Sequence, residues 1–239
     1  KIKYKNIIYK FQTNLIGKIQ IKNILMAMLA AEKSKLKFKQ IIKIIGSVKS
    51  VCGRFEKIGV LKNNAKVILD YAHTPAALGT CLENIKEQFK DKKISVVFGC
   101  GGNRDQSKRP MMGKIANYYC DKIYLTDDNP RNENPKKIRS EIKKKIAKSK
   151  FYEISDRSKA IQKAIFDLKT GEILVVAGKG HENNQDYGKK KKLFSDKNEI
   201  LKSIKMKNKF LFNDFKINIL KELSGSKKIT IKTKINKAS

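Results

Sequence analysis

The sequence predicts an α/β protein with a Rossmann-like, doubly wound and mostly parallel sheet, extended by helices at both ends. From residue 65 onward, short β-branched runs alternate with helical stretches, which is typical of a parallel sheet. Glycine-rich and charged segments follow directly after these runs, where an open parallel sheet places its ligand-binding loops. The chain has 239 residues, 40% of them hydrophobic, which is enough for one sizeable core.

Five strands are expected in the sheet, namely Ala65–Asp70, Ile94–Phe98, Lys122–Thr126, Phe151–Ile154 and Ile173–Ala177. Four helices are expected between them, near residues 75–90, 110–120, 135–148 and 157–168. Three of these helices begin at a proline, since the first helical turn needs no N–H group from Pro75, Pro110 or Pro135. Ser155 or Asp156 can cap the fourth helix.

Both ends of the chain are expected to extend this sheet domain with helices. Residues 1–52 contain one short strand candidate, Ile7–Phe11, and an apolar helix at Gln20–Ala31, with a second helix near residues 38–46. Residues 197–223 are expected to form a lysine-rich helix. We therefore expect residues 1–52 to be the end of a larger structural unit.

The net charge of +33 allows two interpretations. Concentrated on one face, it would favour binding to nucleic acid or an anionic membrane. Lysine is instead scattered through nearly every segment beside Ile and Asn, and these three residues share A/T-rich codons, so genomic bias is favoured. The run Lys189–Lys192 is expected to be a solvated loop. A basic nucleic-acid-binding protein remains an alternative, against which stand the absence of Trp and of an aromatic-studded basic stretch.

The cysteines and the apolar runs indicate a cytoplasmic protein. No CxxC spacing connects the four cysteines, which favours reduced thiols over a metal site or a disulfide framework. The longest apolar runs are far shorter than the roughly 18 residues of a membrane span. The first residues show no signal-peptide pattern.

The loops after the first two strands offer groups for polar and anionic ligands. Asp70 could accept hydrogen bonds from a sugar hydroxyl, and His73 could donate to a phosphate or a base. A capped helix start with a surface histidine is the alternative. In the next loop, Gly99–Asp105, glycines can form a concave anion site to which Arg104 and the Lys108-Arg109 pair add charge. A plain tight turn is the alternative there.

The loops after the third and fifth strands carry groups suited to a free amino acid. Asp128 can hold an ammonium group, and Arg131 can bind a carboxylate through two parallel hydrogen bonds. A zwitterionic end group needs such a pair, although a simple polar turn is the alternative. In the loop Gly178–Glu182, glycine allows a ligand to approach closely and Glu182 offers a second ammonium acceptor.

Taken in order, five motifs resemble the Mur ligase family: GRFE (Gly53–Glu56), DYAHTP (Asp70–Pro75), GCGGNRD with KRP (Gly99–Pro110), DNPR (Asp128–Arg131) and GKGHE (Gly178–Glu182). The resemblance covers roughly residues 53–200 in register. DNPR resembles the recognition motif of the members that add meso-diaminopimelate, whereas lysine-adding relatives usually differ at its arginine. A lysine-adding or folylpolyglutamate-synthetase-like ligase is the nearest alternative. Two positions depart from the common pattern, Ala76 and Asn103, where acidic residues are usual.

The resemblance implies roles for individual residues. Those implied to bind meso-diaminopimelate are Arg109, Asp128, Asn129, Pro130, Arg131, Gly178 and Glu182. Those implied to contact the base, ribose or phosphates of ATP are Arg54, Asp70 and His73. It assigns no catalytic group and no metal ligand to this chain.

The activity that the resemblance implies is ATP-dependent amide ligation in peptidoglycan synthesis. The glutamyl carboxylate of UDP-N-acetylmuramoyl-L-alanyl-D-glutamate is phosphorylated by ATP, and the amine of meso-diaminopimelate attacks the acyl phosphate. Family members bind the UDP-sugar through an N-terminal domain, and their central domain carries the phosphate loop and most Mg²⁺ ligands. No G-x-x-x-x-G-K-[ST] occurs here, so we expect the chain alone to be inactive.

The expected domain organisation follows from the same resemblance. Residues 1–52 resemble only the end of the central domain, and residues 53–204 resemble the whole C-terminal domain of a Mur ligase. Residues 205–239 are expected to be a linker that could open a fused second ligase. This last prediction rests on residues 213–225 and 235–239, which resemble the beginning of the D-alanyl-D-alanine-adding ligase.

Overall fold

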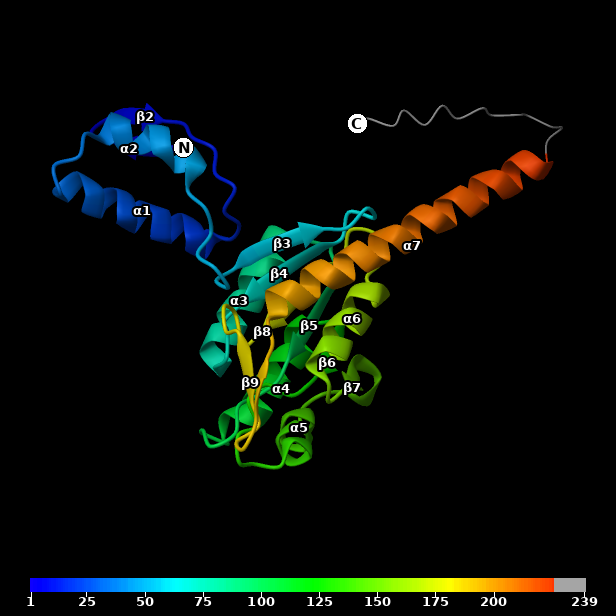
Figure 1. Ribbon diagram of the computed structural model, residues 1–239. Helices are drawn as coiled ribbons and strands as arrows, with labels where there is room; N and C mark the ends of the chain where they lie inside the picture. The colour runs from blue at the N-terminus through cyan, green and yellow to red at the C-terminus, as the bar shows by residue number, and fades with distance from the viewer. Residues whose placement is uncertain (226–239) are drawn as a thin grey trace.

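The computed structural model describes residues 1–225, and a six-stranded sheet lies at its centre (Figure 1). The strands, in their order across the sheet, are β3 (Glu56–Val60), β4 (Lys66–Asp70), β8 (Ile173–Ala177), β5 (Ile94–Phe98), β6 (Lys122–Leu125) and β7 (Phe151–Glu153). Pairing is parallel from β4 through to β7, so the five predicted parallel strands are confirmed. The antiparallel edge strand β3 was not predicted, because a register shift at Lys57 to Gly59 interrupts the alternation that would have marked it.

Helices cover both faces of the sheet, which confirms the doubly wound prediction. On one face lie α3 (Pro75–Gln88), α4 (Lys108–Tyr119) and α5 (Pro135–Lys143), and on the other lie α6 (Arg157–Asp167) and α7 (Asp196–Gly225). Neighbouring residues of a strand join different cores, since successive side chains point to opposite faces. In β4, for example, Ile68 belongs to the core on the α3 side, while Val67 and Leu69 belong to the core on the side of α6 and α7. Burial on both faces explains the continuous apolar run of β8 and the run of β5, which only Ser95 interrupts.

Three of the four predicted helix starts are confirmed, whereas α4 begins at Lys108, two residues before the predicted Pro110. The side chains of Thr74, Asn134 and Asp156 each accept a hydrogen bond from a backbone N–H in the first turn of α3, α5 and α6. Pro75 and Pro135 occupy the first turns of two of these helices. These caps fix the point at which each loop turns into its helix, and so limit how far the loop side chains can move.

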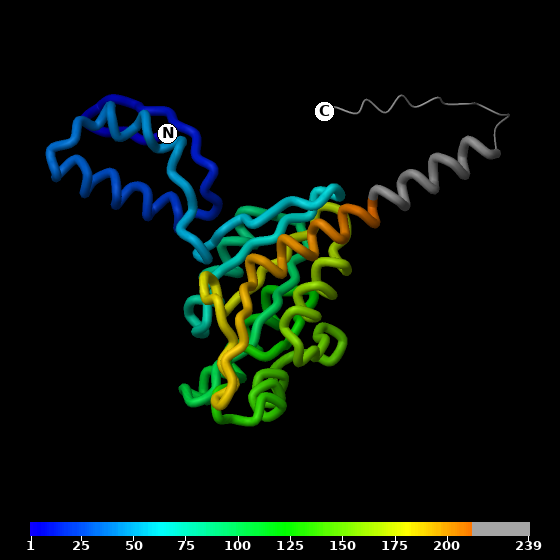
Figure 2. Tube along the Cα trace, viewed as in Figure 1, coloured from blue at the N-terminus to red at the C-terminus, as the bar shows by residue number. Residues whose placement is uncertain are grey.

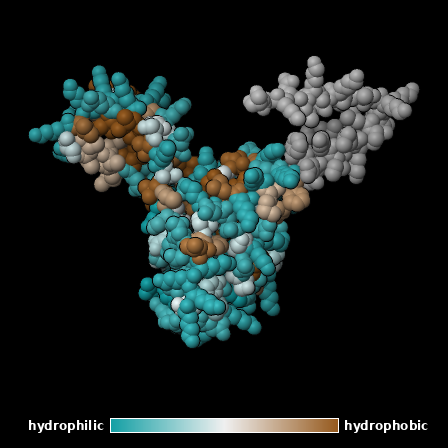
Figure 3. All heavy atoms as spheres, viewed as in Figure 1, coloured by the Kyte–Doolittle hydropathy of each residue, from teal (hydrophilic) through white to brown (hydrophobic). Residues whose placement is uncertain are grey.

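The N-terminal segment forms a small unit beside the sheet domain (Figure 2). Its elements are the hairpin of β1 (Ile2–Tyr4) and β2 (Ile7–Tyr9), then α1 (Lys18–Lys33), α2 (Phe38–Ile44) and the short 3-10 helix η1 (Ile45–Ser47). The strand and both helices predicted for this segment are confirmed, and they enclose a cluster of Ile24, Met28, Ile41 and Ile45. Apolar residues gather on its surface (Figure 3), where Ile8 and Met26 are more than half exposed.

The remaining elements are a 3-10 turn, a hairpin and the C-terminal helix. The turn is η2 (Lys148–Lys150), and the hairpin joins β9 (Asn184–Asp186) to β10 (Lys191–Leu193). The hairpin was not predicted, although its lysines are exposed as expected. Helix α7 passes through residue 205 without a break, and the domain boundary there stays a prediction. Part of the segment that resembles a second ligase, residues 226–239, lies outside the described residues.

Within residues 1–225, none of the helices combines the length and the apolar character needed to cross a bilayer.

Candidate functional site

The loops that follow β4, β5, β6 and β8 enclose a cavity of about 690 Å³ at one edge of the sheet. We call it the strand-end cavity. Its position follows from the parallel order of the strands, whose carboxyl ends all meet at this edge. The lining residues are Tyr71, His73, Thr74, Pro75, Gly101, Arg104, Asp105, Ser107, Lys108, Met111, Asp128, Asn129, Arg131, Gly178 and Glu182.

Five of the seven residues predicted to bind an amino acid line this cavity, namely Asp128, Asn129, Arg131, Gly178 and Glu182. The structure thus brings together the two loops that carry them, although these loops lie far apart in the sequence. Arg131 takes a left-handed backbone conformation with φ of 52°. Its Nη1 donates to the carbonyls of Gly102, at 2.8 Å, and Asn129, at 3.5 Å. The part-exposed guanidinium keeps further N–H groups for a ligand carboxylate.

Arg109 and Pro130, the other two predicted residues, do not line the cavity. The guanidinium of Arg109 is fully buried between Glu141, at 2.7 Å, and Glu133, at 2.9 Å. These ion pairs tie the start of α4 to α5 and to the segment before it. In this structure Arg109 therefore holds the glycine loop in place, and its contact with an amino acid stays a prediction.

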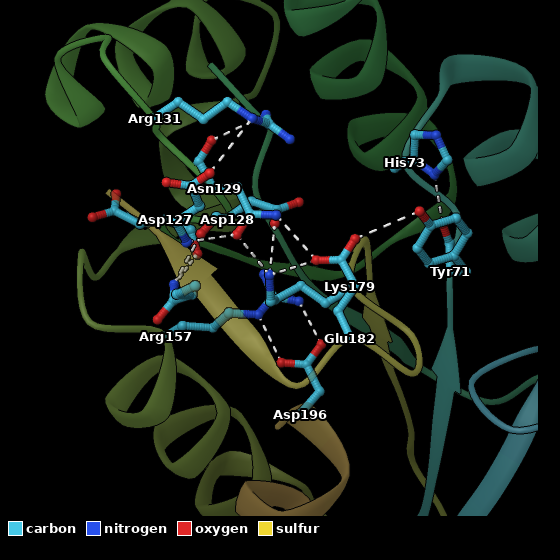
Figure 4. A network of polar contacts seen from close by, with 12 residues as sticks. Tyr71, His73, Asp127, Asp128, Asn129, Arg131, Arg157, Lys179, Glu182 and Asp196 are labelled. Carbon is cyan, nitrogen blue, oxygen red and sulfur yellow. Dashed lines mark hydrogen bonds and ion pairs between the residues drawn. The ribbon is translucent and has the colours of Figure 1, made fainter. Parts of the chain in front are cut away.

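Lys179 lies at the centre of the polar network under the cavity (Figure 4). Its side chain is fully buried, and its Nζ lies 2.9 Å from Asn129 Oδ1, 2.9 Å from Glu182 Oε2 and 3.4 Å from Asp128 Oδ1. All three partners are predicted site residues. This role could not be predicted from the sequence, because one lysine does not stand out in a chain with so many lysines.

Glu182 is held ready to accept hydrogen bonds from a cation. Burial alone would raise its pKa, but hydrogen bonds from Lys179 and Asn129, together with the charges of Lys179 and Arg131, outweigh burial and lower the pKa below its ordinary value. The carboxylate is therefore ionised at neutral pH. Its Oε1 lies 3.5 Å from the Tyr71 hydroxyl, on the side of the cavity.

A second buried ion pair supports the same loops from below. Arg157 and Asp196 are both fully buried and form two hydrogen bonds of 2.7 Å, while Arg157 Nη2 also donates to the carbonyl of Ala177 at 2.9 Å. This contact fixes the chain just before Gly178. A methyl group at Gly178, whose φ is 113°, would lie 3.0 Å from Asp128 Oδ2, so glycine is needed for the approach of the two loops.

The β9–β10 hairpin holds the DNPR loop, Asp128–Arg131, through hydrogen bonds. The buried Gln185 donates from Nε2 to the carbonyls of Asp127, at 3.1 Å, and Asp128, at 3.0 Å. The backbone N–H of Asp186 donates to Asn129 Oδ1 at 3.0 Å, and its carbonyl accepts from the N–H of Arg131 at 2.9 Å. These contacts satisfy backbone groups that a loop cannot satisfy by itself.

A second cavity, of about 470 Å³, lies between α1 and α3, and we call it the helix cavity. It is lined by Ile19, Gln20, Asn23, Val51, Arg54, Phe55, Asp70, Ala76, Ala77, Thr80 and Cys81. The list includes Arg54 and Asp70, which were predicted to contact ATP, whereas His73 lies in the strand-end cavity. Gln20 and Asn23 were not predicted, because they occur in an otherwise apolar helical pattern.

Asp70 and Tyr71 connect the helix cavity to the rest of the site. Burial raises the pKa of Asp70, although the carboxylate accepts backbone hydrogen bonds from Phe55, at 2.7 Å, and Ala72, at 2.8 Å. The guanidinium carbon of Arg54 lies 4.4 Å from the centroid of the Tyr71 ring, in a cation–π arrangement. Tyr71 therefore contacts Arg54 of one cavity with its ring and Glu182 of the other with its hydroxyl.

The turn before β3 and the loop after β8 meet backbone to backbone. A methyl group at Gly53, whose φ is 68°, would lie 2.4 Å from the amide nitrogen of His181 and 2.5 Å from the carbonyl carbon of Gly180. Only glycine permits this contact. Among the side chains that the structure describes, those of residues 1–211, no three His, Cys, Asp or Glu are grouped so as to hold a metal ion.

Comparison with known proteins places this domain in a defined family. Residues 53–180 match the family model described as Mur ligase, glutamate ligase domain. The UDP-N-acetylmuramoyl-L-alanyl-D-glutamate–2,6-diaminopimelate ligase of Rickettsia montanensis is 46% identical over 204 residues, covering 85% of this chain and 42% of the relative. The enzyme of the same name from Rhizobium meliloti is 42% identical over 197 residues, covering 82% of this chain and 40% of the relative. The chain thus spans about two fifths of the length of these relatives.

Solved structures give the same result. A UDP-N-acetylmuramoyl-L-alanyl-D-glutamate–2,6-diaminopimelate ligase superposes with a TM-score of 0.65 at 33% identity, covering 83% of this chain and 40% of the other. A folylpolyglutamate synthase from Thermotoga maritima superposes with a TM-score of 0.56 at 24% identity, covering 72% of this chain and 38% of the other. The second likeness shows a shared fold and nothing more.

Proposed function

Because the chain belongs to the Mur ligase family, we propose that it is the amino-acid-binding part of an ATP-dependent ligase that adds meso-diaminopimelate to UDP-N-acetylmuramoyl-L-alanyl-D-glutamate. The names of the Rickettsia and Rhizobium relatives, at 46% and 42% identity, support this activity. Since the chain spans about two fifths of those relatives, the complete reaction is proposed for a longer protein.

The observation that carries the proposal is the meeting of opposite charges in the strand-end cavity. Arg131 comes from the loop after β6, while Asp128 and Glu182 come from the loops after β6 and β8. The distal end of meso-diaminopimelate has one carboxylate and one ammonium group. We assign the carboxylate to Arg131 and the ammonium to the two acidic side chains, with Asn129 beside them. Lysine lacks the distal carboxylate and would leave Arg131 without a ligand partner.

In the proposed reaction this chain orients the amine toward the activated glutamyl carboxyl. Fixing the distal end of the amino acid places its other amine at a defined distance, and such positioning supplies much of the rate enhancement in a two-substrate reaction. Arg104 and Lys108 line the same cavity and add positive charge where a phosphorylated carboxyl would approach. Arg109 would act indirectly, through the glycine loop that it holds.

We further propose that Arg54, Asp70 and His73 contact ATP. Arg54 and Asp70 lie in the helix cavity, whose walls are partly apolar and carry the amides of Gln20 and Asn23, a combination suited to a planar base. Magnesium ligands are expected mainly from the central domain of the longer protein. The use of ATP and a nucleotide-linked sugar agrees with the cytoplasmic location expected from the sequence.

Binding to the 239-residue chain tests the proposal. We expect meso-diaminopimelate to raise the melting temperature, with stabilisation of about 2.7 kcal/mol at a hundred times the Kd. L-Lysine and L-glutamate should do so weakly at equal concentration, because each lacks one of the groups that the cavity binds. If lysine raised the melting temperature as much as meso-diaminopimelate does, the lysine-adding alternative would be favoured. If glutamate did so, the folylpolyglutamate-synthetase-like alternative would be favoured. Tight binding of duplex DNA at physiological salt, with no response to any amino acid, would favour the nucleic-acid-binding alternative.

A further inference from the structure

We propose that Lys179 is the internal counter-ion of the strand-end cavity and makes the site selective for an amino-acid end group of zero net charge. This inference rests on the proposed function. Lys179 is a positioning residue, because its fully buried ammonium contacts Asp128, Asn129 and Glu182, which line the cavity, and does not line the cavity itself.

Several charged residues near the strand-end cavity form ion pairs with one another. Arg157 is paired with Asp196, and both are fully buried. Arg139 contacts the carboxylates of Asp127 and Glu153. Arg131 lies 4.0 Å from Asp186, and Arg104, Asp105 and Lys108 also line the cavity. In the loops after β6 and β8, four charged groups line the cavity or contact its lining carboxylates, and we call them the charge set: Asp128, Glu182, Lys179 and Arg131.

The charge set sums to zero, with two carboxylates, one ammonium and one guanidinium. Without Lys179, the charge set would consist of two carboxylates and one guanidinium. An end group that carries only an ammonium would then fit the electrostatics better than a zwitterion does. With Lys179 present, the charge set is neutral. It therefore complements a zwitterionic end group, which has one charge of each sign.

The geometry leaves room for a ligand ammonium beside Lys179. An ionised carboxylate accepts about four hydrogen bonds, and Lys179 with Asn129 occupies only Oε2 of Glu182. Asp128 receives Lys179 at Oδ1, while its Oδ2 lies next to Gly178 at the cavity wall. Lys179 therefore approaches from below, and the sides of both carboxylates that face the cavity stay available.

A second buried lysine provides a comparison within the same chain. Lys207, on α7, donates from Nζ to the carbonyls of Ile165, at 3.0 Å, Phe166, at 3.1 Å, and Leu168. All of its partners are neutral main-chain groups at the end of α6, outside both cavities. Lys207 closes a helix end, whereas Lys179 neutralises side chains that face a ligand. The two lysines are therefore a matched pair for mutagenesis.

Three ligands that differ only at the distal end test the proposal by calorimetry on the 239-residue chain. They are L-lysine, with an ammonium, 2-aminopimelate, with a carboxylate, and meso-diaminopimelate, with both. Lys179→Met removes the charge and keeps the length of the side chain. We expect this variant to weaken the binding of meso-diaminopimelate about tenfold or more, because a charged hydrogen-bond partner of the site is lost. The affinity for L-lysine should stay the same or rise, and the affinity for 2-aminopimelate should fall the most.

Three further variants separate charge balance from simple disruption. Glu182→Gln leaves an excess positive charge and should shift the preference toward 2-aminopimelate, opposite to the shift in Lys179→Met. The double variant Lys179→Met with Glu182→Gln sums to zero again and should regain the preference for meso-diaminopimelate, with all affinities lower. Lys207→Met should lower the melting temperature and leave the ligand preferences unchanged. If Lys179→Met alone does not fold, the double variant and Glu182→Gln still carry the test.

The outcomes distinguish this inference from the function on which it rests. A wild-type chain that does not bind meso-diaminopimelate would overturn the proposed function. A wild-type chain that binds it, with Lys179→Met weakening all three ligands by one common factor, would overturn the charge-balance role alone. A shift of the ligand preference in the same direction in Lys179→Met and in Glu182→Gln would also overturn that role.

Discussion

The two cavities lie on either side of Tyr71 and are lined by different structural elements and different kinds of residue. The strand-end cavity is walled mostly by loops that follow parallel strands, and charged groups dominate its floor. The helix cavity is walled mainly by side chains of α1 and α3, with Arg54 and Asp70 at one end. The difference suits the first cavity to charged ligand groups, as proposed, and the second to a more apolar ligand group.

The comparison also shows what each kind of wall needs for support. A helix satisfies its own backbone groups, so the residues of α1 and α3 need few partners below them. Loops have no such internal pairing and must be held from outside. Around the strand-end cavity this is done by buried polar side chains. Lys179 and Gln185 contact the loop after β6 directly, and Arg157 donates to the carbonyl of Ala177 at the end of β8. Changes in these supports should therefore affect one cavity and spare the other.

The largest expected effect comes from removing Arg131. Arg131→Ala leaves the distal carboxylate of meso-diaminopimelate without its paired hydrogen bonds, a loss of roughly 2–5 kcal/mol. Efficiency with this substrate in the full-length ligase should fall about 30-fold or more, while the poor use of lysine changes little. Arg131→Lys, with the same left-handed backbone, should recover only part, because one ammonium does not reproduce the planar fork. An alanine variant with the wild-type preference for diaminopimelate over lysine would refute the assignment.

A smaller effect is expected at Gln185, which no ligand touches in the proposed site. Gln185→Leu leaves the buried carbonyls of Asp127 and Asp128 without their donor, and each such loss costs about 1–3 kcal/mol. Urea unfolding should show this loss, and calorimetry should show weaker binding of meso-diaminopimelate. Gln162→Leu, at a part-exposed glutamine on α6, is the control and should change neither. If Gln185→Leu bound the amino acid normally, the hairpin would have no part in shaping the loop.

The smallest expected effect tests the helix cavity. Arg54→Ala removes a cation–π contact with Tyr71, worth about 0.5–2 kcal/mol, and one predicted contact with ATP. In the full-length ligase, the KM for ATP should rise several-fold, with the KM for meso-diaminopimelate nearly unchanged. Steady-state kinetics with each substrate varied in turn measures both. An equal rise in both values would show that Tyr71 couples the two cavities and that they do not act separately.

The fold was predictable because its signals are local. Parallel strands buried on both faces leave continuous apolar runs, and proline or a capping side chain marks the helix starts at Thr74, Asn134 and Asp156. The short strand β3 and the hairpin left no such pattern, because Gly59 interrupts the first and the lysines of residues 189–192 were expected to form a solvated loop.

The site was predictable only where its residues form motifs within one loop. Asp128, Arg131 and Glu182 could be assigned because each stands in a short, unusual segment. Lys179, Arg157 and Gln185 act through contacts that join distant segments, and their residue types are ordinary in this sequence. The same reasoning explains Arg109, whose place in a charged loop suggested a ligand contact, whereas the structure gives it two glutamates.

The backbone contact of Gly53 with Gly180 and His181 has a consequence for how the domain is made. It joins two turns separated by most of the domain, and β8, the last strand of the sheet in sequence, inserts between β4 and β5. Contacts between such distant residues form late in folding, because a long loop must close first. During synthesis the loop after β8 can therefore join the loops after β4, β5 and β6 only once residue 182 has left the ribosome. A chain released before that point would contain all lining residues of the helix cavity but would lack Glu182 of the strand-end cavity.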